Sequence, residues 1–400
     1  MSARTTEASP LRLAAFWLGI QAVWGALLGI SLQARTIELA GPAAMVAYGH
    51  LATCGAIVAA VVQIAVGPLS DRLRRRGSRR IEFYLVGATI AAAALVEFYL
   101  APALASLTAA FLVLQAGMNV AIGPYQAIIP DVVGRERYGV ASSWMAALQS
   151  AGNALGALAA SFINDARALG GALAGLLLGT AAITSAHVRQ CALEPVPEVQ
   201  PLRIDRPFVD LFVSRALVYV GFYTLLGYLL FYVSAVLHAP SLPRARFESG
   251  VLILAFTVVG VIGAAAAARP SDRIDKRLVA AAGGIVVAVA LAVFIGGSSL
   301  PLAAAATAIA GLGWGVFLVA DWAIACRILP AGALATTMGI WNLALIVPQI
   351  VAPALTTFVL QRCAATAGPL GPKIAFALAL AETLAGIAWL QRLPGKLTGE

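Results

Sequence analysis

Charged residues are scarce in this chain of 400 residues: only 11% are Asp, Glu, Lys or Arg, whereas 61% are hydrophobic. A soluble domain carries about 25% charged residues, so most of this chain cannot face water. The four cysteines are widely separated, and we expect free thiols and no disulfide. The three histidines do not cluster, and the chain lacks a Walker A sequence, a nucleophile elbow and a catalytic carboxylate pair. We therefore expect no metal site, no cofactor and no enzymatic activity.

Long hydrophobic runs fill the chain, and a helix of about 20 such residues crosses a bilayer. Twelve helices are predicted, over residues 11–33, 43–68, 81–101, 103–128, 139–162, 168–188, 211–238, 248–268, 278–297, 301–326, 335–360 and 372–391. Residues 189–210 are rich in proline and charge. The sequence predicts an all-α integral membrane protein of twelve transmembrane helices, with an N-terminal six-helix bundle over 1–188, a cytoplasmic linker over 189–210 and a C-terminal six-helix bundle over 211–400.

The net charge of +9 does not indicate a nucleic-acid partner, because the basic residues lie in the breaks between hydrophobic runs. With both termini in the cytoplasm, 21 of the 27 lysines and arginines fall on the cytoplasmic side, which is the bias of membrane proteins. The first residues lack a signal-peptide cleavage site, so the first helix is expected to be retained. We expect a multi-pass protein of the cytoplasmic (inner) membrane.

A charged segment interrupts the hydrophobic pattern at residues 67–80, GPLSDRLRRRGSRR, which holds six arginines. A weaker copy, PSDRIDKR, follows at residues 270–277, and a shift of 196 also aligns residues 117–142 with 313–338. These repeats predict two pseudo-symmetric bundles. Such duplicated halves are common in secondary transporters, whose solute site lies between the halves near mid-membrane.

The charged segments predict a cytoplasmic latch that holds one conformation and breaks in another. Gly67 is expected to let a helix end pack close to a neighbouring backbone, and Asp71 can cap a helix N-terminus. Membrane anchoring is the alternative role for these residues, and it is the favoured one for Arg74, Arg75 and Arg76. The gating candidates are Gly67, Asp71, Arg72, Arg79, Arg80, Asp272 and Arg273.

Together these features resemble the major facilitator superfamily over essentially the whole chain. Residues 67–72 match its Gly-x-x-x-Asp-Arg signature, and residues 119–131 and 339–349 look like the sucrose transporters and the glycoside–pentoside–hexuronide:cation symporters. The resemblance implies alternating access and a central cavity lined by the first, fourth, seventh and tenth helices. Gln115 and Gln126 stand where the sucrose symporters carry an aspartate and an arginine, which departs from their proton coupling and disaccharide recognition.

Polar and aromatic stripes fall on those four helices. In the first helix, Trp17, Gln21, Trp24, Leu28 and Ser31 recur at helical spacing and share one face. Intramembrane polar groups usually face the bundle interior or a wet cavity, and helix–helix hydrogen bonding is the alternative role. The substrate-binding candidates are Gln21, Trp24, Gln115, Asn119, Tyr125, Gln126, Tyr219, Tyr223, Trp314, Trp322 and Asn342.

Three carboxylates lie in the apolar interior of the predicted helices, away from their first residues: Glu97, Asp321 and Glu382. A carboxylate in an apolar environment binds a proton more readily than in water, as a proton carrier requires. Asp321 is the first coupling candidate, and a structural pair with Arg327 or with the N-terminus of the eleventh predicted helix is its alternative. Glu382 is the second candidate because its helix is normally peripheral. Arg215 is expected to pair with Asp210 or a lipid.

These observations predict a secondary active transporter of a small solute, with a sugar or glycoside preferred because the stripes are neutral and rich in amides and aromatic rings. Energy would come from a proton or cation gradient, and the expected partners are the solute, the co-transported ion and membrane lipids. We expect a monomer. Two alternatives remain: an exporter of amphipathic or drug-like molecules, and a non-transporting assembly factor or sensor on the same fold.

Overall fold

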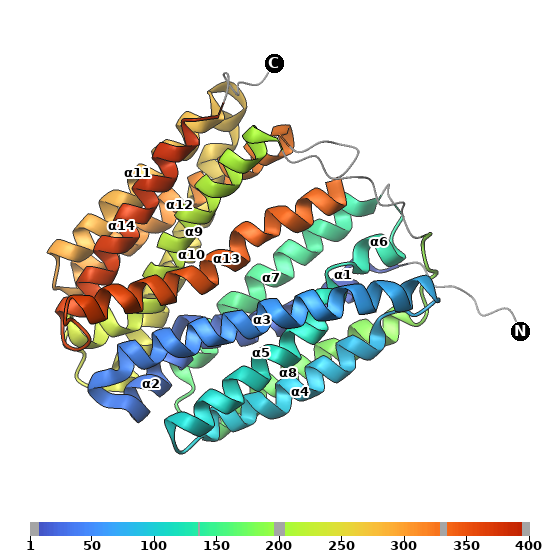
Figure 1. Ribbon diagram of the computed structural model, residues 1–400, viewed down its shortest axis with the longest axis horizontal. Coiled ribbons are helices and arrows are strands. Elements are labelled where there is room, and N and C mark those ends of the chain that lie inside the picture. Colours follow the sequence, from blue (N-terminus) through green and yellow to red (C-terminus); the bar gives the residue numbers. More distant parts are fainter. Residues whose placement is uncertain (1–7, 135–136, 196–204, 329–333, 394–400) are drawn as a thin grey trace, which may run out of the picture. The chain divides into compact units, whose positions relative to one another are not determined.

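The computed structural model describes residues 8–134, 137–195, 205–328 and 334–393 (Figure 1), and these residues form helices joined by short loops, without a strand. Only the backbone is described for residues 130, 138–139, 268, 271–272, 326–328 and 334–343. Ten stretches of the described chain are long and apolar enough to cross a membrane. The first of them, residues 10–75, contains two long helices.

The helices fall into twelve long segments, which confirms the predicted all-α membrane fold. The N-terminal helices are α1 (Pro10–Ala26), the π-helix η1 (Leu27–Ser31), α2 (Leu32–Ala40), α3 (Ala44–Arg75), α4 (Ile81–Leu100), α5 (Leu104–Tyr125), α6 (Ile128–Val132), α7 (Tyr138–Phe162) and α8 (Ala166–Val188). The C-terminal helices are α9 (Arg206–Ala235), α10 (Leu242–Arg273), α11 (Lys276–Gly296), α12 (Leu300–Ile328), α13 (Leu334–Arg362) and α14 (Leu370–Leu390). The first segment is continuous from α1 through η1 to α2, and α6 is a single short turn.

Helices α3 and α10 end several residues later than the hydrophobic pattern predicts. Both α3 and α10 have 32 residues and continue beyond the apolar run into the charged segments. Most of the charged segment 67–80 is therefore helical, and the turn that follows is confined to residues 76–80. Arginine and leucine are good helix formers, so charge ends the membrane-spanning part without ending the helix. Gly77, at φ +92°, then terminates α3.

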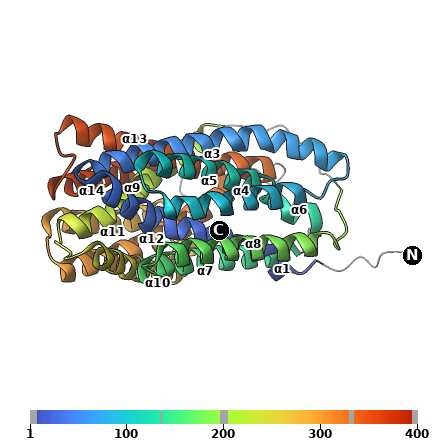
Figure 2. The same ribbon diagram turned by 90° about the horizontal axis from the view of Figure 1, so that it is seen from below.

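The chain divides into two compact units, residues 1–39 with 54–197 and residues 40–53 with 198–400. The division after residue 197 lies inside the stretch 189–210. In the N-terminal unit, α1 packs against α7 and α8, and α4 packs against α5 and α8. Helices α4, α5 and α8 run side by side in Figures 1 and 2. In the C-terminal unit, α9 packs against α13 and α14, and α11 packs against α12 and α14. The corresponding helices thus pair in the same way in both units.

Matching glycine pairs hold the corresponding hairpins together. A Cβ on Gly87 of α4 would lie 2.6 Å from the carbonyl oxygen of Gly117 on α5. In the C-terminal unit, a Cβ on Gly283 of α11 would lie 2.7 Å from the carbonyl oxygen of Gly313 on α12. Both pairs are 30 residues apart in the sequence and are related by the shift of 196. Small residues let membrane helices approach closely, so the repeat is also a repeat of packing.

Gly87→Ala is expected to destabilise the N-terminal unit by about 1–3 kcal/mol, because backbone atoms of α5 cannot move aside for the new methyl group. Gly175→Ala in α8 is the matched control, since no described atom lies within 4 Å of a Cβ there. Replacing that helical glycine should stabilise by about 0.5–1 kcal/mol. Thermal unfolding in detergent measures both changes. Equal effects would contradict the packing role of the glycine pair.

Candidate functional site

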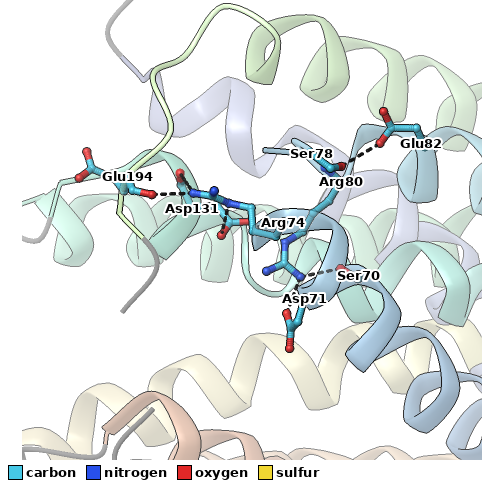
Figure 3. Close-up of polar contacts among 8 residues, drawn as sticks. All are labelled: Ser70, Asp71, Arg74, Ser78, Arg80, Glu82, Asp131 and Glu194. Atoms are coloured by element: carbon cyan, nitrogen blue, oxygen red, sulfur yellow. Dashed lines mark hydrogen bonds and ion pairs between the residues drawn. The ribbon is translucent and has the colours of Figure 1, made fainter. Parts of the chain in front are cut away.

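Asp131 in α6 lies between two arginines of the charged segment (Figure 3). Its Oδ1 accepts a hydrogen bond from Arg74 Nε at 3.1 Å, and its Oδ2 accepts one from Arg80 Nε at 2.7 Å. The Arg80 guanidinium also reaches Asp71 Oδ1 at 2.9 Å and Ser70 Oγ at 2.5 Å. Both arginine side chains are 7% exposed and Asp131 is 13% exposed. We call these five residues the arginine–aspartate network.

The backbone of Arg80 has φ 62°, a left-handed conformation that non-glycine residues seldom adopt. Arg80 is also the N-cap residue that precedes α4, and its backbone N–H donates to Ser78 Oγ at 3.0 Å. Such strain persists only where the surrounding structure imposes it, and it clusters at functional positions. The bonds to Asp131, Asp71 and Ser70 impose it here.

The network and the adjacent Arg79 also bind the chain that follows α8. Arg74 Nη2 donates to the carbonyl oxygen of Glu194 at 2.6 Å, and Arg79 Nη1 donates to that of Cys191 at 2.5 Å. The Glu194 amide in turn donates to the Asp131 carbonyl oxygen at 2.9 Å. Burial raises the pKa of the Cys191 thiol, so it remains a neutral thiol. The first residues after α8 are thus part of the same assembly.

Two expectations for the charged segment are corrected. Arg74 is not a surface anchor but a buried partner of Asp131, because the helix continues and places it one turn after Ser70, on the same face. Gly67 does not admit a close neighbour, since no described atom lies within 4 Å of a Cβ built there. Arg72 is exposed.

The second copy of the segment differs from the first. The side chain of Asp272 lies outside the described residues, and Arg273 is exposed. Arg277 Nη2 binds Asp275 Oδ2 at 2.6 Å, and its Nη1 donates to the carbonyl oxygen of Leu393 at 2.6 Å. The gating prediction for Asp272 and Arg273 therefore stays a prediction.

The amides of α5 bind other helices of the N-terminal unit. Asn119 Nδ2 donates to the Gln115 carbonyl oxygen at 2.8 Å, and its Oδ1 accepts from Gln63 of α3 at 2.6 Å. Gln115 and Asn119 are buried. This is the helix–helix hydrogen bonding that was the alternative to solute contact. Gln126, one residue after α5 ends, is exposed.

The polar stripe of the first helix does not keep one register. The π-helical turn η1 inserts an extra residue into the helix. Leu28, near its start, is half-buried like Gln21, whereas Ser31, at its end, is buried. The Ser31 and Tyr99 hydroxyls are hydrogen bonded at 2.8 Å. Gln21 and Trp24 are half-buried, whereas Trp17 is buried.

Tyr125 lies in the interior of the N-terminal unit. Its hydroxyl donates to the carbonyl oxygen of Leu13 at 2.6 Å, and its ring packs against Phe16 and Trp17 of α1. The ring is completely buried. In this conformation its hydrogen-bonding capacity is used within the unit.

Arg215 of α9 and Asp321 of α12 form a buried ion pair in the C-terminal unit. Their side chains are 1% and 3% exposed. Arg215 pairs with Asp321, whereas its expected partner Asp210 accepts a hydrogen bond from the Trp389 indole at 3.2 Å. The side chain of Arg327, the partner expected for Asp321, lies outside the described residues. Two opposite charges in otherwise apolar helices were the sequence signal for this pair.

Aromatic rings surround that ion pair. The Arg215 guanidinium lies 5.0 Å from the centre of the Tyr219 ring and 5.7 Å from that of Trp322. Tyr219 contacts Trp314 with ring centres 5.0 Å apart. Cation–π contacts of this kind stabilise a guanidinium away from water. Of these rings, Trp322 is the exposed one, at 44%.

Two of the three remaining candidates in the C-terminal unit form hydrogen bonds within that unit. Tyr223 accepts a hydrogen bond at its hydroxyl from Gln349 of α13 at 2.9 Å. Glu382 of α14 is buried, and Thr224 donates to its Oε2 at 3.3 Å. The side chain of Asn342 lies outside the described residues.

A cavity inside the C-terminal unit lies among residues of α9, α10, α11, α12 and α14, including Phe222, Trp314 and Thr383. Its volume of about 10 Å³ is room for about one water molecule. A sugar-sized solute does not fit there.

Comparison with known proteins identifies the fold. The family model described as Major Facilitator Superfamily matches residues 13–353. The structure resembles a bacterial homolog of the human lysosomal transporter Spinster, with a TM-score of 0.72 and 15% identity over 96% of this chain and 95% of that one. It also resembles the nucleoside transporter NupG, with a TM-score of 0.71 and 12% identity over 95% of this chain and 98% of that one. A comparison with the curated proteins found no match.

The likeness to these solved structures, at such identities, shows the fold alone. The sucrose and glycoside–pentoside–hexuronide branch remains a prediction. The family model, in contrast, spans both units and most of the twelve long helical segments. This chain is therefore a multi-pass membrane protein that belongs to the major facilitator superfamily.

Proposed function

We propose that this protein is a secondary active transporter of a small, neutral, polar solute, with a sugar or glycoside preferred, in the cytoplasmic membrane. The observation that carries the proposal is the Arg215–Asp321 pair, which neutralises and buries the charges of two predicted cavity helices. The accessible members of the predicted solute-binding set are then uncharged. They are the amides and aromatic rings of Gln21, Trp24, Gln126, Tyr223 and Trp322. A sugar offers hydroxyl groups to such amides and an apolar ring face to an indole.

The arginine–aspartate network supports alternating access as the mechanism. Its charged residues lie between helices of one unit, at the predicted cytoplasmic end. The two arginines are buried, whereas the side chain of Asp71 is 59% exposed. Such a cluster can be opened in steps, because the exposed bond costs less to break than the buried ones. We propose that it holds one conformation of the transport cycle.

The test is thermal unfolding of the purified protein in detergent with a panel of sugars, glycosides, nucleosides, carboxylates and amphipathic cations. A ligand that binds only the folded state stabilises it by about 2.7 kcal/mol at 100 times its Kd. We expect stabilisation by a sugar or glycoside, and loss of that effect in Gln21→Ala. Thr89→Ala on the exposed face of α4 is the matched control and should keep it. Stabilisation by charged solutes alone would contradict a neutral substrate.

The aromatic cluster of the C-terminal unit favours a second function, export of amphipathic molecules. Phe222 stacks on Trp314 with ring centres 4.2 Å apart. Trp322 lies eight residues after Trp314 on α12 and is exposed. Flat apolar surfaces of this kind also bind drug-like molecules. Stabilisation by amphipathic cations and not by sugars would assign this function. Solute binding without flux in proteoliposomes would instead assign a non-transporting sensor.

A further inference from the structure

Glu382 is a buried carboxylate that has no basic partner among the residues whose side chains are described. It lies midway along α14 and is 7% exposed. Its Oε2 accepts one hydrogen bond, from Thr224 at 3.3 Å, and its Oε1 is buried without a partner among the described residues. Asp321, in contrast, binds Arg215. Glu382 and Asp321, both buried in the C-terminal unit, are thus in opposite electrostatic situations.

The groups beside Glu382 are hydroxyls. The Thr224 Oγ1 that donates to the carboxylate lies 3.4 Å from Thr356 Oγ1 of α13. A hydroxyl can donate to a carboxylate and can also accept from a protonated carboxyl group. Thr224 and Thr356 can therefore satisfy either protonation state of Glu382 by rotating their hydroxyl hydrogens. A lysine or arginine could stabilise only the charged state.

The helices around Glu382 carry other charged and titratable side chains, which bind other partners or lie at other positions along those helices. On α9, α11, α13 and α14 they are Arg206, Asp210, Arg215, Tyr219, Tyr223, Tyr228, Tyr232, Lys276, Arg277, Arg362 and Lys373. None of them makes a described ion pair or hydrogen bond with Glu382. An ionised carboxylate in that environment is costly, because neither water nor a countercharge compensates for its lost hydration.

We propose that Glu382 is a proton-binding site of the C-terminal unit, with Thr224 as its hydrogen-bond partner and Thr356 as the partner of Thr224. A proton from water adds to a carboxylate oxygen, the neutral carboxyl group stays buried, and release returns the proton to water. Proton binding itself follows from this geometry. Its coupling to solute movement rests on the proposed transport function. The structure thereby reverses the order of the sequence candidates, because Asp321 already has a permanent cationic partner.

The direct test is infrared titration of the purified protein, following the carbonyl band of a protonated carboxyl group as the pH changes. We expect a titrating band that is absent in Glu382→Gln and present in Glu97→Gln, an exposed acid of α4 that serves as the control. Thr224→Val should keep the band but shift its frequency, because it removes the hydrogen bond. A titration unchanged by Glu382→Gln would overturn the proposal. Loss of the band on adding sodium at constant pH would overturn it too, since it would assign the site to that ion.

The second measurement uses proteoliposomes and a solute identified by thermal stabilisation. Glu382→Gln is expected to lose uptake driven by a pH gradient and to keep solute exchange at equal concentrations. Retained proton-driven uptake would overturn the coupling. A protein that moves no solute, yet shows the Glu382 band, would refute the transport function and leave the proton site standing. The two failures are therefore distinguishable.

Discussion

Asp321→Leu is expected to lower the free energy of unfolding by about 3–5 kcal/mol, the usual cost of leaving one partner of a buried ion pair alone. The Arg215 guanidinium would remain 1% exposed and charged, because arginine cannot lose its proton in a protein. The contacts with the Tyr219 and Trp322 rings offset only part of that cost. Thermal unfolding in detergent, with the wild-type protein alongside, measures the loss.

The reverse substitution and the double substitution separate charge from packing. Arg215→Leu should lower the free energy of unfolding by less. Asp321 can take up a proton when Arg215 is removed, whereas Arg215 cannot release one when Asp321 is removed. Combining both substitutions should recover much of the stability, because two apolar side chains replace a desolvated pair. Additive losses in the double variant would show that the two residues stabilise the unit independently and that the pair is not the reason for their burial.

Asp131→Asn is expected to destabilise the N-terminal unit by about 3 kcal/mol. The substitution keeps the shape of the side chain but removes the charge that holds Arg74 and Arg80, whose side chains are each 7% exposed. Two guanidinium groups would then remain close together, with the exposed Asp71 beside Arg80 as the countercharge that is left. Solute exchange in proteoliposomes should change with stability, since the network also fixes the chain after α8 through Glu194.

Asp71→Asn is the matched control, because Asp71 binds the same Arg80 but is 59% exposed. A solvated ion pair contributes about 0–1 kcal/mol, so the thermal midpoint should hardly move. The latch role predicts that the inward/outward balance and the transport rate nevertheless change. Equal loss of stability in the Asp71 and Asp131 variants would contradict the central place of Asp131, and unchanged transport in Asp71→Asn would leave membrane anchoring as its role.

Hydropathy was sufficient to place the helices, because a bilayer leaves no alternative to a helix for a long apolar run. The predicted range 81–101 and the observed α4, Ile81–Leu100, show how closely the two agree. The same measure failed at α3, which continues to Arg75. Polarity marks where a helix leaves the membrane, whereas propensity and capping decide where it ends.

The sites were less predictable, because they depend on pairings between distant helices. Asp131 was visible as an acid at a helix exit, but its two arginine partners are more than 50 residues away in the sequence. The π-helical turn at Leu27–Ser31 has no sequence pattern of its own, and it broke the stripe predicted for the first helix. Arg215 and Asp321 could have been paired from their opposite charges, had helices α9 and α12 been considered together.

The shared glycine register of the two hairpins has a consequence for biosynthesis. Gly87 with Gly117, and Gly283 with Gly313, join helices that are consecutive in the chain. Contacts between neighbouring segments have low contact order and form early. Each hairpin can therefore assemble as soon as its second helix has been synthesised, before the rest of its unit exists. Duplication of the ancestral half would have copied this early assembly step together with the fold.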